Sequence, residues 1–194
     1  MNVKENNEEA FLVTAAKQGN RKAFDELYVR YRNAIADLVY RYLGNYQESE
    51  ELLQEIFIQG FLNLDKFKIR QYASFFSWLY RIGINMSINY LRRQKSRSES
   101  LRYQPPALSP EENSDNPERH VVKMEFEKYL YLGLDQISPR QRMIFVLKHL
   151  QDMSIGEIAQ LLHCTEGTVR KQLFRGVTKL RKEMSVYRGE KNEM

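Results

Sequence analysis

The 194-residue sequence contains one cysteine, Cys164, and only three histidines. A single cysteine excludes an internal disulfide and leaves no CxxC pair for zinc. The histidines lack the i,i+4 spacing with which two imidazoles bind one metal ion on a helix; they are His120, His149 and His163. We therefore expect no metal site and no cofactor.

Long uncharged apolar runs are also absent. No stretch of about 18 apolar residues occurs, so no transmembrane helix is expected. The first residues, MNVKENNEEAF, are polar and acidic and do not resemble a signal peptide. Hydrophobic residues make up 42% of the chain and charged residues 28%, a composition typical of soluble folded proteins. We expect a cytoplasmic protein that does not insert into a membrane.

Charge is unevenly distributed along the chain, although the net charge is only +5. Residues 62–97 hold eight Lys and Arg against one Asp, and residues 138–194 hold eleven against six acidic residues. Between them, residues 99–118 hold one Arg against five acidic residues. Two basic blocks that flank an acidic one indicate two contact points on a nucleic acid.

The pattern of apolar residues predicts an all-α fold with two small helical domains. Apolar residues recur at helical spacing almost throughout, and no stretch alternates with period two for long. Residues 1–97 are predicted to form a bundle of three or four helices. Its helices are a first one with an apolar stripe from Phe24 to Tyr42 that ends at Gly44, a second from about Glu48, and a third from about Ser74 to Arg93.

Residues 98–120 are predicted to be an acidic linker, because helical periodicity fails there and four prolines occur: Pro105, Pro106, Pro110 and Pro117. Residues 121–194 form the second domain. Ser138 and Ser154 each begin a helix, the latter with the capping box Ser154-x-x-Glu157. Thr165 can cap a further helix that runs to about Glu183. The tight connection at residues 162–164 makes the last two helices a helix-turn-helix.

The last helix has the two faces of a DNA-reading helix. Val169, Leu173, Val177 and Leu180 share its predicted buried side. On or beside the opposite face are the candidate contacts to duplex DNA: Thr168, Arg170, Lys171, Phe174, Arg175 and Thr178. Arg can donate two hydrogen bonds to guanine, and Phe can contact a thymine methyl. The alternative is a surface helix whose cations only favour solubility, but an exposed Phe174 has no role there.

The first basic block mixes seven aromatic residues with its cations, which suits single-stranded DNA because unstacked bases lie on rings. Its candidate contacts are Phe67, Lys68, Arg70, Tyr72, Ser77, Asn85, Asn89, Arg92 and Arg93. The alternative is that the rings belong to the core. We assign Trp78, Leu79 and Ile82 to the core and leave Phe67 and Tyr72 open.

In the order and spacing of its motifs the chain resembles the extracytoplasmic-function (ECF) sigma factors of bacterial RNA polymerase. The motifs are Ala23-Phe24-x-x-Leu27-Tyr28, Glu50-Glu51-Leu52-Leu53-Gln54-Glu55-Ile56-Phe57, Ser77-Trp78-Leu79-Tyr80-Arg81-Ile82-x-x-Asn85 and Gly167-Thr168-Val169-Arg170. Two departures occur, Glu51 where Asp is common and His163 where Gly is common. The helix-turn-helix alone is not specific, because response regulators share it.

The resemblance implies a sigma subunit without a catalytic site of its own. Its partners would be core RNA polymerase, promoter DNA and an anti-sigma factor. The first domain would be sigma region 2, and its residues Asp65–Ser74 and the following helix would capture bases of the minus-ten element. The second domain would be sigma region 4, which reads the minus-thirty-five element, and the acidic linker would imitate nucleic acid. The residues expected to bind core polymerase are Glu50, Glu51, Leu52, Gln54, Glu55 and Phe57.

Two other classes remain in competition. A helix-turn-helix transcription regulator would bind duplex DNA without core polymerase, but the predicted all-helical first domain does not resemble a receiver domain. An enzyme acting on nucleic acid would need a metal cluster or an activated nucleophile, and the sequence shows neither.

Overall fold

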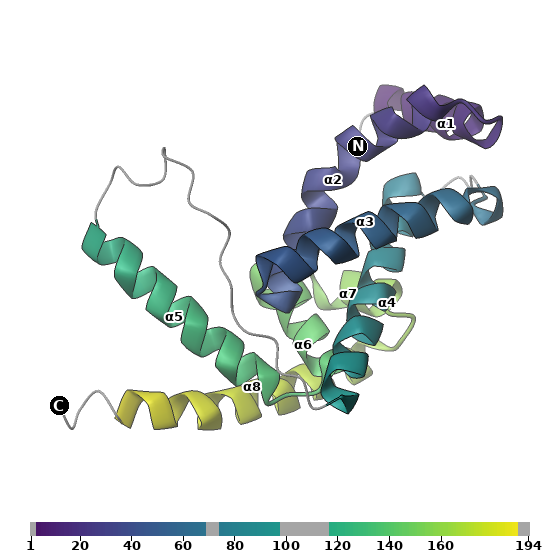
Figure 1. Ribbon diagram of the computed structural model, residues 1–194. Helices are drawn as coiled ribbons and strands as arrows, with labels where there is room; N and C mark the ends of the chain where they lie inside the picture. The colour runs from purple at the N-terminus through teal and green to yellow at the C-terminus, as the bar shows by residue number, and fades with distance from the viewer. Residues whose placement is uncertain (1–2, 69–73, 98–116, 190–194) are drawn as a thin grey trace.

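The computed structural model of the chain describes residues 3–68, 74–97 and 117–189, which form helices without a strand (Figure 1). The first unit comprises α1 (Val3–Lys17), α2 (Arg21–Leu43), α3 (Tyr46–Leu62), the 3-10 turn η1 (Leu64–Lys66) and α4 (Phe75–Ser96). The second comprises α5 (Pro117–Asp135), α6 (Pro139–Phe145), the π-helical turn η3 (Val146–Leu150), α7 (Ile155–Leu161) and α8 (Glu166–Gly189). The predicted all-α fold with two small helical domains is confirmed.

Side-chain caps explain where the helices of the first unit begin. Asn20 accepts a hydrogen bond from the Ala23 N–H at 3.3 Å, and Asn45 accepts one from the Glu48 N–H at 3.0 Å. At the other end of α2, Gly44 adopts the left-handed conformation at φ +70°, which ends the helix as predicted. α1 was not predicted. Leu12, Val13 and Ala16 bury its apolar face against the core, but the apolar pattern is weak because the buried side also holds Glu9 and the exposed side holds Phe11.

The two units pack against each other. Both α6 and η3 of the second unit contact helices of the first, α6 against α4 and η3 against α2. Met143, Ile144 and Leu147, all fully buried, extend the core of the first unit into the second. This contact was not predicted, because an apolar stripe on a short helix does not say which helix covers it.

A smaller apolar cluster joins α5 to α8, which extend together away from the main core (Figure 1). Its buried members are Leu130, Tyr131, Leu134, Ile137 and Leu180. Because α5 begins at Pro117, residues 117–120 are helical although we had assigned them to the linker. The rest of that predicted linker, 98–116, lies outside the described residues. In the described parts, none of the helices has the length and apolar character needed to cross a bilayer.

Candidate nucleic-acid and polymerase interfaces

The helix-turn-helix is held in shape by reciprocal hydrogen bonds at the start of α7. The Ser154 hydroxyl accepts from the Glu157 N–H at 3.2 Å, and the Glu157 carboxylate accepts from the Ser154 N–H at 2.8 Å. Hydrogen bonds from Ser154 hold the pKa of Glu157 below its ordinary value. The predicted capping box is therefore present, and it sets the angle at which the chain enters α7.

The turn between α7 and α8 depends on a residue in the left-handed region. His163 has φ +49°, a conformation that glycine adopts at lower cost. The Cys164 N–H then donates to the Ala159 carbonyl at 2.9 Å, and the Thr165 hydroxyl caps α8 by accepting from the Thr168 N–H at 3.2 Å. Thus His163 reaches the conformation that the common glycine would allow.

One face of α8 is buried and the other is open, as the helical spacing predicted. Val169 is fully buried and Leu180 nearly so. All six predicted upstream-element residues are exposed: Thr168, Arg170, Lys171, Phe174, Arg175 and Thr178. Phe174 is 73% exposed, which is unusual for a phenylalanine. Arg170 forms an exposed ion pair with Glu166 at 2.8 Å, which contributes little to stability.

The second candidate DNA-binding face lies on α4 and the chain before it. Ser74 caps α4 by accepting from the Ser77 N–H at 3.0 Å. The predicted downstream-element residues that are exposed are Lys68, Ser77, Asn85, Asn89, Arg92 and Arg93. Arg70 and Tyr72 lie outside the described residues.

Phe67 does not lie on this face. It is only 4% exposed, and its ring packs 5.7 Å from Phe75 and 5.4 Å from Trp78. The prediction that Phe67 contacts bases directly is wrong for this structure, because its ring completes the aromatic core beneath η1 and α4. Trp78 and Ile82 pack against the core as expected, although each remains partly exposed.

The predicted polymerase-binding residues of α3 differ in exposure. Glu51, Gln54 and Glu55 are exposed. Leu52 and Phe57 are 2% and 4% exposed and belong to the core, so the assignment of Leu52 as a direct contact is corrected, and Phe57 can contact a partner only where it lines a groove. Glu50 is half-buried and paired with Arg32 at 3.0 Å.

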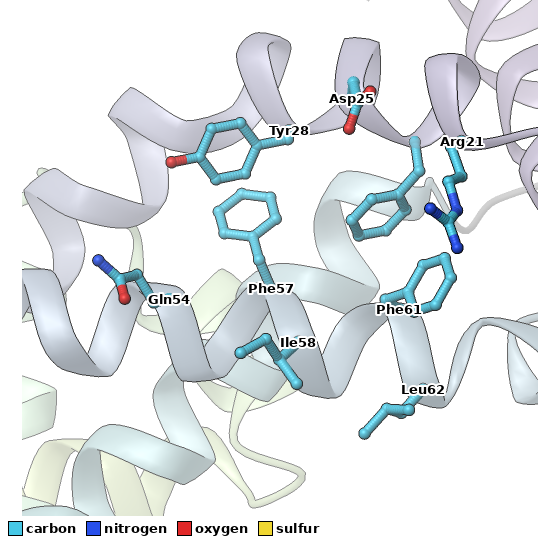
Figure 2. A pocket seen from close by; sticks show the side chains of 9 residues that line it. Arg21, Asp25, Tyr28, Gln54, Phe57, Ile58, Phe61 and Leu62 are labelled. Carbon is cyan, nitrogen blue, oxygen red and sulfur yellow. The ribbon is translucent and has the colours of Figure 1, made fainter.

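Beside the exposed polar residues of α3 runs an apolar groove between α2 and α3, with a volume of about 570 Å³. Figure 2 shows the Tyr28 ring next to the Phe57 ring in its lining; the two rings pack edge to face with their centroids 4.7 Å apart. Three exposed apolar residues line it and were not predicted as contacts: Ile58, Phe61 and Leu62. Phe61 follows the buried Phe57 at i,i+4 spacing, which predicts a buried side chain, yet Phe61 is 46% exposed. The signal was Ile58 and Leu62, two apolar residues four apart that fall outside the stripe formed by Leu52, Leu53, Ile56 and Phe57.

The described residues offer no group of three or more His, Cys, Asp or Glu side chains arranged to hold a metal ion. They present two exposed faces that carry cations and hydrogen-bonding side chains, one on α4 and one on α8. They also present an apolar groove between α2 and α3. The two faces are suited to a polyanion, and the groove to a protein surface.

Comparison with known proteins agrees with these features. Residues 27–97 match the family described as Sigma-70 region 2, and residues 127–180 match Sigma-70, region 4. The ECF RNA polymerase sigma factor SigW of Bacillus subtilis is 31% identical over 181 residues, which cover 89% of this chain and 94% of that protein. The ECF RNA polymerase sigma-E factor of Escherichia coli is 33% identical over 172 residues, covering 84% and 87%.

Solved structures share the fold. CnrH, in complex with the cytosolic domain of CnrY, has a TM-score of 0.59 at 20% identity, covering 92% of this chain and 98% of that one. The sigma factor RpoE from Bartonella quintana, in complex with the anti-sigma factor NepR, has a TM-score of 0.57 at 18% identity, covering 85% and 98%. Since matches to both sigma regions and to full-length relatives coincide, the chain belongs to the ECF family of RNA polymerase sigma factors.

Proposed function

We propose that the chain acts as an alternative sigma factor that binds core RNA polymerase, directs it to specific promoters and helps to melt the minus-ten element. Family membership supports this function. The observation that carries its sequence-reading part is the exposed face of α8, where two arginines, a lysine and a solvent-exposed Phe174 lie on one capped recognition helix.

The face of α8 is proposed to enter the major groove of the minus-thirty-five element. Arg175 and Lys171 are exposed, so their side chains can reach base edges or phosphates. Arg170 would exchange its exposed Glu166 partner for DNA at small cost. Phe174 would contact a thymine methyl.

The face of α4 is proposed to bind the opened minus-ten element. Asn85, Asn89 and Arg92 follow one another at i,i+4 and i,i+3 spacing and are all exposed, so they can contact consecutive nucleotides. Ser77 at the start of the helix and Lys68 before it extend the same contact. Roles for Arg70 and Tyr72 remain predictions from the sequence.

The groove between α2 and α3 is proposed to bind core polymerase. Exposed apolar side chains that gather in one groove mark a protein interaction site, and Glu51, Gln54 and Glu55 on the same helix can select a basic partner. Phe57 contributes from the floor of the groove rather than from its rim.

Residues 1–97 are thus proposed as the minus-ten and core-binding unit and residues 121–194 as the minus-thirty-five unit, joined by an acidic linker that imitates nucleic acid. We propose that the protein has no catalytic site of its own and works in the cytoplasm, where the polymerase is. An anti-sigma factor is the expected regulator; one similar structure is such a complex.

In vitro transcription with core polymerase over a genomic fragment library tests the function and reports the promoter motif. Arg175→Ala is expected to relax the choice of upstream bases at a cost of about 1–3 kcal/mol. Lys128→Ala, which removes an exposed cation of α5, is the control and should leave the motif unchanged. Tight, specific duplex binding by the chain alone, without transcription in the presence of core, would contradict the sigma function and favour a helix-turn-helix regulator.

A further inference from the structure

Glu166 is an acidic side chain at the edge of the face of α8 that is proposed to read DNA. It lies in the first turn of the helix, and 51% of its side chain is exposed. Arg170 and Phe174 follow it in steps of four residues, so the three side chains form one row along the helix. The other two are proposed to contact DNA, and no role has yet been given to Glu166.

The carboxylate of Glu166 has neighbours on both helices of the helix-turn-helix. Its Oε2 accepts a hydrogen bond from Nη2 of Arg170 at 2.8 Å. Its Oε1 lies beside the first turn of α7, where a Cβ built on Gly156 would be 3.4 Å away. A hollow of about 560 Å³ lies between this turn and the start of α8 and is lined in part by Glu166. The side chain therefore has room to turn when Arg170 leaves it.

A carboxylate at this place limits which bases α8 can accept in the major groove. DNA phosphates repel it, and so do guanine and thymine, whose major-groove edges present acceptor atoms. Cytosine instead presents the N4 amino group, a donor with which Glu can pair. Adenine also donates, from N6, but it places the N7 acceptor beside that donor. The carboxylate thus favours cytosine, partly by repelling the alternatives.

The position of Glu166 on the helix suits contact with a base edge. In a helix-turn-helix, side chains from the beginning of the recognition helix reach the base edges. Glu166 precedes Arg170 by about 6 Å along the helix, which is roughly two base-pair steps. When Arg170 turns to the DNA, the carboxylate loses its cation, and the amino group of a nearby base can replace the guanidinium as the donor.

We propose that Glu166 is a specificity-determining residue for the upstream promoter element. Its carboxylate accepts a hydrogen bond from the N4 amino group of a cytosine that lies within about two base pairs of the base contacted by Arg170. This inference rests on the proposed function. A purely structural role would be different, because an acidic residue in the first turn also stabilises a helix through the helix dipole. That role would affect stability and leave the choice of bases unchanged.

The test uses holoenzyme assembled from core polymerase and the full-length chain, on a barcoded promoter library randomised across the upstream element found by the transcription experiment. The readout is the base preference at each position. Wild type should prefer cytosine at a position close to the one that changes in Arg170→Ala. Glu166→Ala should lower this preference by about tenfold. Glu166→Gln should transfer the preference to adenine, because a Gln amide pairs with adenine N6 and N7.

Glu183→Gln is the matched control. Glu183 lies on the same helix about 25 Å further on, well past the part that a major groove about 12 Å wide can contain, so the motif should not change. A cytosine preference that survives in both folded Glu166 variants overturns the proposal, as does a wild-type motif without cytosine at these positions. A change confined to the base read by Arg170 also overturns it, since Glu166 would then act only through Arg170. If the wild-type holoenzyme shows no upstream preference at all, it is the proposed function that fails.

Discussion

The Arg142 Nε donates a 2.6 Å hydrogen bond to the backbone carbonyl of Tyr42, which lies 100 residues earlier in the chain. The Arg142 Nη2 reaches the Leu43 carbonyl at 3.0 Å, and Nη1 pairs with Asp135. Tyr131 donates to the Arg41 carbonyl at 3.2 Å. The last four carbonyl groups of a helix lack a donor within the helix. In α2 the Gly44 N–H donates to the first of these carbonyls, that of Tyr40, and side chains of the second unit donate to the other three.

Arg142→Met is expected to lower the free energy of unfolding by about 3 kcal/mol, because it leaves buried carbonyls at the end of α2 and the Asp135 carboxylate without their donor. Urea denaturation followed by circular dichroism measures the change. Lys128→Met, at an exposed position of α5, should change stability by less than about 0.5 kcal/mol. Equal midpoints for the two variants would show that Arg142 does not hold the units together.

Gly44→Ala is expected to destabilise the protein more than Gly19→Ala does. Both glycines have positive φ, +70° and +88°, so each substitution carries the cost of the left-handed region, about 1–2 kcal/mol. A Cβ at Gly44 would also lie 2.3 Å from Cδ1 of Tyr131, whereas none of the described atoms lies within 4 Å of one at Gly19. The difference in melting temperature between the two variants measures the cost of the clash with Tyr131, because both variants carry the cost of a positive φ. Equal losses would mean that Tyr131 moves aside without cost.

The two units are expected to separate when the promoter binds. The elements named minus-ten and minus-thirty-five are about 25 base pairs apart, which at 3.4 Å per pair is about 85 Å. In this structure α6 contacts both α4 and α8. Neighbouring helix axes are about 8–10 Å apart, so the two DNA-binding faces lie much closer together than the elements.

A reducible thiol cross-linker tests this separation in a Cys164→Ser background. Asp37→Cys with Gln151→Cys joins the units where their side chains form a 2.7 Å hydrogen bond. Cross-linking should abolish transcription, and reductant should restore it. Glu26→Cys with Arg30→Cys, a pair within α2, is the control and should transcribe in both states. Normal transcription by the cross-linked Asp37–Gln151 variant would be the contrary result.

The capping box of the helix-turn-helix should make stability depend on pH. The pKa of Glu157 is lowered from 4.5 by its hydrogen bonds with Ser154, so its contribution is present above about pH 4.5 and is lost as the pH falls through the lower folded-state pKa. The stability difference between wild type and Glu157→Gln should therefore shrink as the pH falls below about 4.5. Urea denaturation midpoints of the two proteins, measured at a series of pH values, report this stability difference. A difference that does not change with pH would contradict the prediction.

Leu62→Asp should weaken binding of core polymerase by about tenfold or more without unfolding the protein, because the side chain is 65% exposed and lines the groove. Val29→Asp is the matched control. Val29 is 73% exposed on α2 but does not line the groove, so its replacement should leave the affinity unchanged. Affinity is measured by titrating labelled core. Equal effects of the two substitutions would remove the groove from the interface.

Local signals in the sequence predicted a large part of this molecule correctly. The capping box at Ser154, the stop at Gly44 and the open face around Phe174 each depend on residues within one or two helical turns, so spacing alone was sufficient. The family motifs then supplied the function, because they lie in a recognisable order. Prediction was weaker wherever a residue's burial depended on a distant helix: Phe67 and Leu52 are core residues, and Phe61 is exposed.

Tertiary structure alone decided how the parts meet. A carboxylate at position 9 reads in sequence as an ordinary exposed glutamate, and only the approach of α1 to α4 makes it the acceptor for the Phe75 N–H. Arg142 likewise reads as one more cation of a basic block until the end of α2 surrounds it. Helical periodicity reports which face of a helix is apolar; it does not report which partner, from far along the chain, buries that face and satisfies the backbone groups at its end.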